Sequence, residues 1–176
     1  PSHADMVRTP GIDMTAGSLG QGLSCAVGIA IGSKIKKDNA RIYCMIGDGE
    51  SNEGQIWEAA MYGAHMKLDN LIAFTDHNKM QLDGQISEIN DLEPMVDKWT
   101  SFGWNTYRVD GHDVKAIDEA IVKAKEVKGK PSMIILDTIK GKGVSFIEEK
   151  WMNNHNINVT PEEHKAGLEE LLKGGF

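Results

Sequence analysis

The sequence lacks the features that would place a protein in a membrane, outside the cell or on a nucleic acid. No run approaches the roughly 18 consecutive apolar residues of a transmembrane helix. No segment joins a basic start to an apolar centre and a small-residue cleavage site, as a signal peptide does. The formal net charge of −7 argues against a nucleic-acid surface, which needs a basic patch. We therefore expect a cytoplasmic protein with neither a membrane nor a nucleic acid as partner.

Cysteine is also scarce, and an initiator methionine is missing. Cys25 and Cys44 lie in apolar segments, so we interpret them as buried free thiols, with a disulfide as the alternative. The chain starts at Pro1 on a polar stretch with no predicted element before it. Its 176 residues suffice for one domain with a sizeable core. We expect a single domain over residues 1–176 that lacks its N-terminal segment.

Helical and strand patterns alternate along the chain. Strands are predicted at residues 41–46, 71–75, 105–109 and 133–138. Helices are predicted at residues 18–37, at 52–66 with Asn52 as N-cap, at 93–102 with Pro94 in the first turn, after Asp113 and after the capping box at Thr160. Residues 140–158 are expected to form a long loop. This alternation is typical of an α/β fold with a mainly parallel sheet and helices on both faces.

Two short polar motifs each follow a predicted strand. Gly47-Asp48-Gly49 comes after residues 42–46, and Asp76-His77-Asn78 comes after residues 71–75. Ligands of open α/β sheets bind beyond the carboxyl ends of the strands, where Asp48 and Asn78 each place an oxygen atom. Either motif alone is more often a plain turn or loop. Both together, at consecutive strand ends, predict a binding site.

The residue types at this site suit a divalent cation and a diphosphate. Asp48 offers a carboxylate, Asn78 an amide oxygen, and the chain just beyond Asn78 a backbone carbonyl, all of which are ligands for Mg²⁺ or Ca²⁺. Gly47 and Gly49 would let the backbone approach phosphate closely. No cluster of lysine and arginine is evident near either motif, so the cation would supply the positive charge.

The residues around the two motifs resemble the thiamine diphosphate signature of the transketolase family, and the likeness runs from His3 to His155. It implies the thiamine-diphosphate-binding fold. It rests on these segments: residues 15–22, 47–54, 55–59, 67–71, 76–78, 81–84, 110–113 and 140–143.

The resemblance assigns a role to several positions. It implies that Asp48, Asn78 and the main-chain carbonyl of Met80 hold Mg²⁺ or Ca²⁺. It implies that Gly49 donates its backbone N–H to the diphosphate. It also implies that Gly17, Leu19 and Leu82 line the thiamine, although a leucine is more often plain core.

Three further residues match catalytic positions of the family. Glu53 matches a glutamate that interacts with its counterparts across a dimer, although a glutamate there also complements the dipole of the following helix. His3 and His155 match histidines on the substrate side, where a neutral imidazole exchanges protons with sugar hydroxyls. His155 would also approach the cofactor diphosphate. On sequence alone, each histidine is equally compatible with a solvated loop.

The implied activity is transfer of a two-carbon ketol unit from a ketose phosphate to an aldose phosphate, as in the pentose phosphate pathway. The pyrimidine-binding domain that such enzymes need is absent from this sequence, so a partner domain or subunit is expected, in a homodimer or a heterotetramer. Another thiamine diphosphate enzyme, such as deoxyxylulose-phosphate synthase or a 2-oxo acid dehydrogenase component, is one alternative. A non-catalytic interaction protein that kept the fold is the other.

Overall fold

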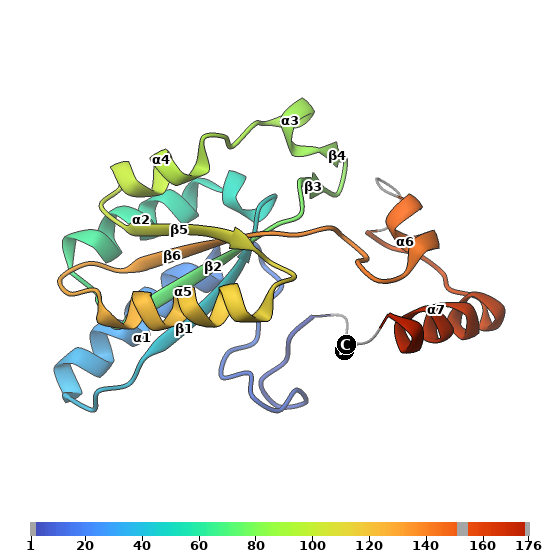
Figure 1. Cartoon of the computed structure of the whole chain (residues 1–176). Coiled ribbons are helices and arrows are strands. Elements are labelled where there is room, and N and C mark those ends of the chain that lie inside the picture. The colour runs from blue at the N-terminus through green and yellow to red at the C-terminus, as the bar shows by residue number, and fades with distance from the viewer. Residues whose placement is uncertain (1–2, 151–154, 175–176) are drawn as a thin grey trace.

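Four parallel strands form the central sheet of the protein. The structure is a computed structural model that describes residues 3–150 and 155–174 (Figure 1). The strand order is β1-β2-β6-β5, with β1 at Ile42–Gly47, β2 at Leu71–His77, β6 at Ser132–Asp137 and β5 at Asn105–Asp110. Helices α1 (Gln21–Lys36), α2 (Gly54–His65) and α4 (Met95–Ser101) cover one face, and α5 (Val114–Glu126) covers the other. The α/β fold expected from the sequence is confirmed.

The two central strands are buried on both faces, which explains their continuous apolar runs. Side chains alternate along a strand, so each strand contributes to two cores. Leu71 and Ala73 of β2 pack toward α1, α2 and α4, whereas Ile72 and Phe74 pack toward α5. β1 is an edge strand, and its Tyr43 is about half exposed.

An aromatic cluster holds α2 and α4 together. The rings of Trp57 and Trp99 lie 5.1 Å apart, and those of Trp99 and Trp104 lie 5.0 Å apart. The indole N–H of Trp104 donates to the carbonyl of Ala60 at 2.9 Å. Gly63 lies against this ring, since a Cβ built there would be in contact with the Trp104 ring and with Val27 of α1, at 3.4 Å from each. The ring contacts and the Trp104 hydrogen bond therefore fasten α2 to α4 and to the turn that follows α4.

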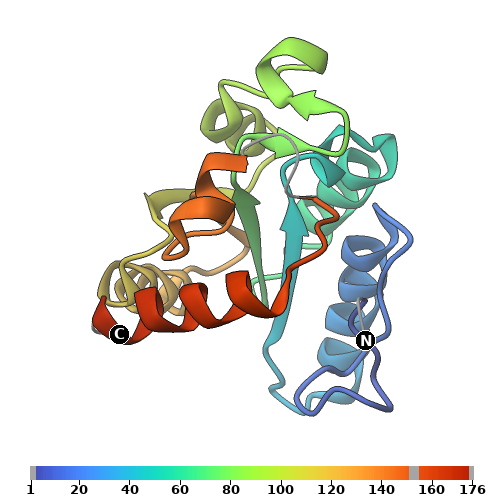
Figure 2. The same cartoon turned by 90° about the vertical axis from the view of Figure 1, so that its right-hand side faces the viewer.

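Short elements gather beyond the carboxyl ends of the strands, and Figure 2 views the molecule from this side. They are the 3₁₀ helix η1 (Glu50–Asn52), β3 (Met80–Gln81), β4 (Gly84–Gln85), α3 (Ile86–Ile89), α6 (Ser145–Lys150) and α7 (Pro161–Lys173). An ion pair between Lys150 and Glu163, 3.2 Å, joins α6 to α7. These elements surround the edge where the two polar motifs end.

Some local predictions were wrong, and the contacts show why. Helix α2 has Glu53 as its N-cap, because Asn52 belongs to the preceding 3₁₀ turn and accepts a hydrogen bond from Asn90. Pro94 is the N-cap of α4 and lies outside its first turn. Residues 140–158 contain α6, and the β3–β4 hairpin and α3 were not expected.

Other local predictions were confirmed. Asp113 caps α5 by accepting from the backbone amides of Lys115 and Ala116. Thr160 forms the expected capping box with Glu163. Both cysteines are free as expected, but neither is fully buried: Cys25 is exposed and Cys44 is partly buried. No helix in residues 3–150 or 155–174 is both long and apolar enough to cross a bilayer.

Trp104 should carry a large share of the stability of the α2–α4 side. We expect Trp104→Ala to lower the free energy of unfolding by about 3–5 kcal/mol, because it leaves a large cavity beside Gly63. Tyr62→Ala is the matched control, because Tyr62 is another aromatic residue but is 52% exposed on α2; it should cost under about 1 kcal/mol. Urea unfolding followed by circular dichroism measures both, and equal losses would contradict this view of the core.

Candidate metal and diphosphate site

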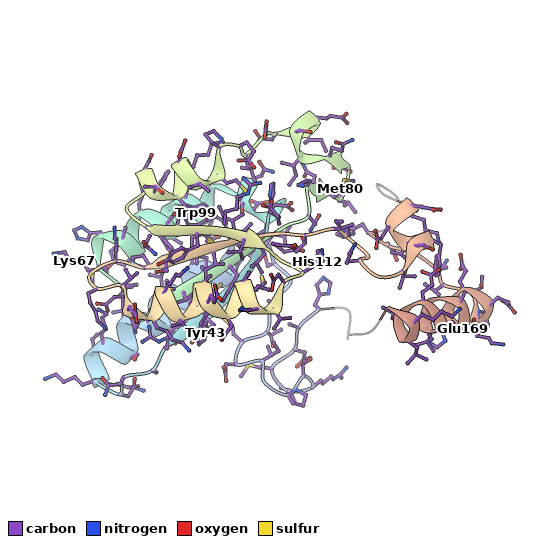
Figure 3. All side chains as sticks on the ribbon, in the orientation of Figure 1. Tyr43, Lys67, Met80, Trp99, His112 and Glu169 are labelled. Carbon is purple, nitrogen blue, oxygen red and sulfur yellow. The ribbon has the colours of Figure 1, made fainter. Side chains whose placement is uncertain are left out.

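The parallel register of β1 and β2 brings the two polar motifs together. Gly47 lies opposite Asp76, and the backbone N–H of Asp48 donates to the carbonyl of Asp76 at 3.1 Å. Asp48 and Asn78 therefore start from adjacent strand ends, as the sequence predicted. Met80, labelled in Figure 3, follows at the same edge.

The Asp48 side chain links the two loops. Only 1% of Asp48 is exposed. Its Oδ1 accepts the backbone N–H of Gly49 at 2.8 Å, and its Oδ2 accepts that of Lys79 at 2.6 Å. Burial raises the pKa of the Asp48 carboxyl, against the lowering effect of these two donors. A cation at this carboxylate would favour its charged form.

Asn78 is held by its own loop. Its Oδ1 accepts the N–H of Met80 at 3.1 Å, and its Nδ2 donates to Asp76 Oδ2 at 2.9 Å. The Thr138 hydroxyl donates to the other oxygen of the Asp76 carboxylate. Asp76 therefore orients the Asn78 amide, and Thr138, directly after β6, in turn orients Asp76.

Gly49 is required by close packing of the two loops. Its backbone angles, φ −59° and ψ −38°, are open to any residue. A Cβ at this position would lie 2.8 Å from the Cβ of Gln81 and 3.9 Å from the carbonyl oxygen of Met80. Its N–H donates to Asp48 in the structure, so it would reach a diphosphate only if Asp48 turned away.

The donor set fits a hard divalent cation. A carboxylate, an amide oxygen and a backbone carbonyl come from Asp48, Asn78 and Met80, which share one pair of interlocked loops. Oxygen ligands of this mixed kind suit Mg²⁺ and Ca²⁺. Across the described ranges, no three side chains of the His, Cys, Asp and Glu types gather into an alternative metal cluster.

A cavity of about 540 Å³ opens beside Asp76 and Asn78. Lys140 and Lys142 line it, so the expectation that no cationic cluster lies near the motifs was wrong. The two lysines could not be linked to the motifs by local spacing, because they are about sixty residues from Asn78 and β6 returns the chain to this edge. The lysines could neutralise a phosphate group alongside a cation.

Two other residues brace this edge. The Glu50 carboxylate accepts the N–H of Gly20 at 2.9 Å and that of Gly47 at 3.0 Å, which ties the start of α1 to the end of β1. His112 Nε2 accepts the N–H of Ile139 at 2.8 Å, which ties the turn after β5 to the turn after β6. Glu50 was missed in the sequence, although it directly follows the Gly-Asp-Gly motif.

The remaining predicted site residues lie in three places. The His3 ring packs over Gly17, where a Cβ would lie 3.1 Å from the ring. His155 is exposed, and its Nδ1 lies 3.3 Å from Lys140 Nζ, beside the cavity. Glu53 is exposed, and its Cβ would lie 3.2 Å from a Cβ built on Gly20.

Leu19 and Leu82 do not belong to the core. They are 59% and 64% exposed, which rules out the plain-core interpretation of either leucine. Exposed leucines near a polar site are available to contact a ligand or another protein surface.

A partly buried network of charged side chains next to the site, here called the Arg108 network, was also missed; it consists of His77, Glu93, Arg108 and Asp137. His77 lies between Asp76 and Asn78 in the chain, and its Nδ1 is 2.9 Å from Asp137 Oδ1. Arg108 forms a two-pronged pair with Asp137, at 2.7 and 2.8 Å, and reaches Glu93 at 2.8 Å. The network joins β2, β6 and β5 to the segment that enters α4. Its members are spread over sixty residues, and no local spacing marks them as partners.

Comparison with known proteins places the chain in one family. Residues 1–166 match the family model described as "Transketolase, thiamine diphosphate binding domain". The 6-deoxy-6-sulfo-D-fructose transketolase subunit SqwG of Clostridium sp. (strain MSTE9) is 57% identical over 99% of this chain and 63% of that protein. An apulose-4-phosphate transketolase subunit of Phocaeicola vulgatus is 40% identical over 94% of this chain and 58% of that protein. The chain thus spans about three fifths of the length of these curated relatives.

Solved structures of transketolases superpose on this chain. Transketolase from Campylobacter jejuni superposes with a TM-score of 0.82 at 29% identity, covering 94% of this chain and 27% of that one. Transketolase from Leishmania mexicana superposes with a TM-score of 0.71 at 26% identity, covering 94% of this chain and 29% of that one.

The Arg108 network gives a pH-dependent prediction. Arg108, followed by His77, holds the pKa of Asp137 at about 2, below the ordinary 3.8. Since the folded pKa is depressed, this stabilisation is present above about pH 4 and is lost as the pH falls toward 2. Arg108→Met should lower stability at neutral pH by about 1 kcal/mol, allowing for solvent screening.

Urea unfolding at a series of pH values measures the difference in the free energy of unfolding between wild type and variant. We expect that difference to narrow as the pH falls below about 4. Arg8→Met is the control, because Arg8 is an exposed arginine outside the network. A difference that stays constant from neutral pH to pH 2 would refute the assigned role of the Arg108–Asp137 pair.

Proposed function

Since the chain belongs to the transketolase family through its thiamine diphosphate binding domain, we propose that it supplies the metal and diphosphate half of a transketolase active site. The convergence of Asp48, Asn78 and Met80 carries this proposal, because it offers three kinds of oxygen ligand at one sheet edge. The cofactors would be thiamine diphosphate and Mg²⁺, with Ca²⁺ as a substitute for Mg²⁺.

In this proposal, Asp48, Asn78 and the Met80 carbonyl hold the cation. Lys140 and Lys142 face the diphosphate from the cavity wall. Gly49 keeps the space between the two loops free of a side chain, and its N–H becomes available to a phosphate oxygen when Asp48 turns to the cation. The Arg108 network would keep the loop at Asn78 in place without touching the ligand.

Residues around this centre would position the rest of the reactants. Thiamine diphosphate, when bound, supplies the carbanion chemistry that moves a two-carbon ketol unit between sugars. Gly17, Leu19 and Leu82 would line the thiamine. His3 and His155 would hold and pass protons at sugar hydroxyls, since an imidazole exchanges protons near neutral pH. Glu53 would interact with its counterpart across a dimer, at the interface between two active sites.

The names of two relatives support a partner. This chain spans 58–63% of relatives that are themselves named subunits. We propose that a pyrimidine-binding transketolase subunit or domain completes the site, in a homodimer or a heterotetramer. The exposed Leu19 and Leu82 would then be covered by the thiamine or by this partner.

The donor substrate is proposed to be a ketose with an anionic end. The relative at 57% identity is named for 6-deoxy-6-sulfo-D-fructose, and the one at 40% for apulose 4-phosphate. The higher identity favours a sulfonated ketose over the sugar phosphates of the pentose phosphate pathway as the first substrate to try.

Gly49→Ala tests the close packing of the two loops. We expect the added Cβ to push the β3–β4 hairpin and Met80 away from Asp48 and to weaken Mg²⁺-dependent binding of thiamine diphosphate at least roughly tenfold. Gly54→Ala is the matched control, because a Cβ there has nothing within 4 Å. Calorimetry with the chain and its partner measures both affinities, and unchanged binding by Gly49→Ala would count against this site.

Partner dependence tests the proposed activity. The chain alone should show no ketol transfer, whereas the chain with a pyrimidine-binding subunit, thiamine diphosphate and Mg²⁺ should consume 6-deoxy-6-sulfofructose in the presence of an aldose phosphate. Turnover by the chain alone would disprove the half-site proposal. Cofactor binding without turnover on any ketose, even with the partner, would favour a non-catalytic relic of the fold.

A further inference from the structure

A second cavity lies at the opposite end of the sheet from the candidate metal site. Its volume is about 360 Å³, and it is lined by the end of α1, the turns before β1 and β2, and Lys128 before β6. Lys34 of its wall donates to the carbonyl of Lys67, and Figure 3 shows Lys67 and Met80 at opposite ends of the sheet. None of the proposed catalytic or cofactor residues lines this cavity.

The cavity wall is strongly cationic in a chain whose net charge is −7. Its charged side chains are Lys34, Lys37, Arg41 and Lys128 against the single carboxylate of Asp69. That carboxylate is already engaged, because Oδ1 pairs with Lys34 at 2.7 Å and Oδ2 accepts the N–H of Gly129 at 2.9 Å.

Three of the cations are not paired with a carboxylate. Within residues 3–150 and 155–174, no ion pair involves Lys37, Arg41 or Lys128. The lysines at the end of α1 partly offset the negative end of the helix dipole. Lys128 is exposed to solvent, whereas Arg41 is partly buried and lies outside α1, so neither explanation extends to Arg41.

Two buried polar atoms in the wall lack a hydrogen-bond partner. They are Nη1 of Arg41, a donor, and Oδ1 of Asn70, an acceptor. The two residues are neighbours, because the N–H of Ile42 donates to the carbonyl of Asn70 at 2.8 Å. The Asn70 amide nitrogen donates to the carbonyl of Ala30 at 3.0 Å, which fixes its oxygen as the unpaired atom. Such orphaned buried groups are rare and costly, so each calls for an occupant.

A water molecule would satisfy these two atoms but not the excess of positive charge in the wall, which favours an anion that both accepts and donates hydrogen bonds. Its oxygens would accept from Arg41 and the lysines, and a hydroxyl would donate to Asn70 Oδ1. Hydrogen phosphate meets both demands, as does a small phosphate monoester that carries a hydroxyl. Sulfate meets only the first, because it has no hydroxyl at neutral pH.

We propose that this cavity is a phosphate-binding site, distinct from the cofactor site, that recognises free phosphate or the phosphate group of a small hydroxylated metabolite. A phosphate there would bridge α1, the starts of β1 and β2, and the turn that holds Lys128. It would therefore brace the amino ends of the two strands that carry Asp48 and Asn78 at their carboxyl ends. The proposal does not depend on the transketolase activity.

Titration of the whole chain by NMR tests the site directly. With sodium phosphate at neutral pH, we expect saturable shifts of the amide signals of Asn39, Asn70 and Gly129. Sodium sulfate at matched ionic strength should bind about tenfold more weakly, because it leaves Asn70 Oδ1 unpaired. Shifts confined to Gly141, Lys142 and their neighbours, no saturation, or equal binding of the two anions would overturn the proposal.

Variants separate the site from general charge attraction. Arg41→Gln and Lys128→Gln should each weaken phosphate binding about tenfold, whereas Lys115→Gln, an exposed lysine on α5 outside the cavity, should leave it unchanged. Lys128 is exposed, so its variant keeps the test valid if Arg41→Gln fails to fold. Equal weakening by all three variants would overturn the site.

Parallel titrations identify the source of the phosphate group. Ribose 5-phosphate binding as tightly as inorganic phosphate or tighter, with ribose not binding, supports a metabolite. Exclusion of ribose 5-phosphate while inorganic phosphate binds supports the free ion. Failure of both to bind would overturn the site.

Discussion

The buried carboxylate of Asp48 is the constraint on which the candidate site depends. Its two oxygens accept the backbone amides of Gly49 and Lys79, and so lock the end of β1 to the loop after β2. This arrangement requires the parallel register that sets Gly47 opposite Asp76. It also requires a residue without a Cβ at position 49, since the hairpin at Gln81 fills that space. The parallel register of β1 and β2 and the glycine at position 49 together fix the positions of the two Asp48 oxygen atoms.

The two ends of the sheet carry different sets of charged side chains. At the carboxyl end, Asp76 shares a cavity wall with Lys140 and Lys142, and the buried Asp48 starts from the adjacent strand end. This arrangement suits a cation bound together with a diphosphate. At the amino end, Lys37, Arg41 and Lys128 form no ion pair within the part of the chain that the structure describes, and they line a cavity with Asp69, which is already paired with Lys34. We propose a metal-assisted phosphate site at the first end and a direct phosphate site at the second, because an anion would offset the nearby positive charge at each.

Much of the fold could be predicted from the sequence because its signals are local. Apolar runs marked the strands, and Asp113 and Thr160 marked helix starts through their own capping contacts. Asp48 and Asn78 were found because consecutive parallel strands end at one edge. The approach of Lys140 and the network of His77, Arg108 and Asp137 could not be predicted, because both depend on β6 lying between β2 and β5. Asn52 misled because capping residues also occupy turns, where its side chain meets Asn90.

Calorimetric titration of thiamine diphosphate into the chain with its pyrimidine-binding partner tests the central claim most directly. The comparison is between Mg²⁺ and a chelator, and between the wild type and Asp48→Asn, which keeps the shape of the side chain and removes its charge. The account predicts tight binding only with Mg²⁺ and the intact carboxylate, and a loss of at least about a hundredfold otherwise. Equal affinity with chelator, or equal affinity in Asp48→Asn, would contradict it.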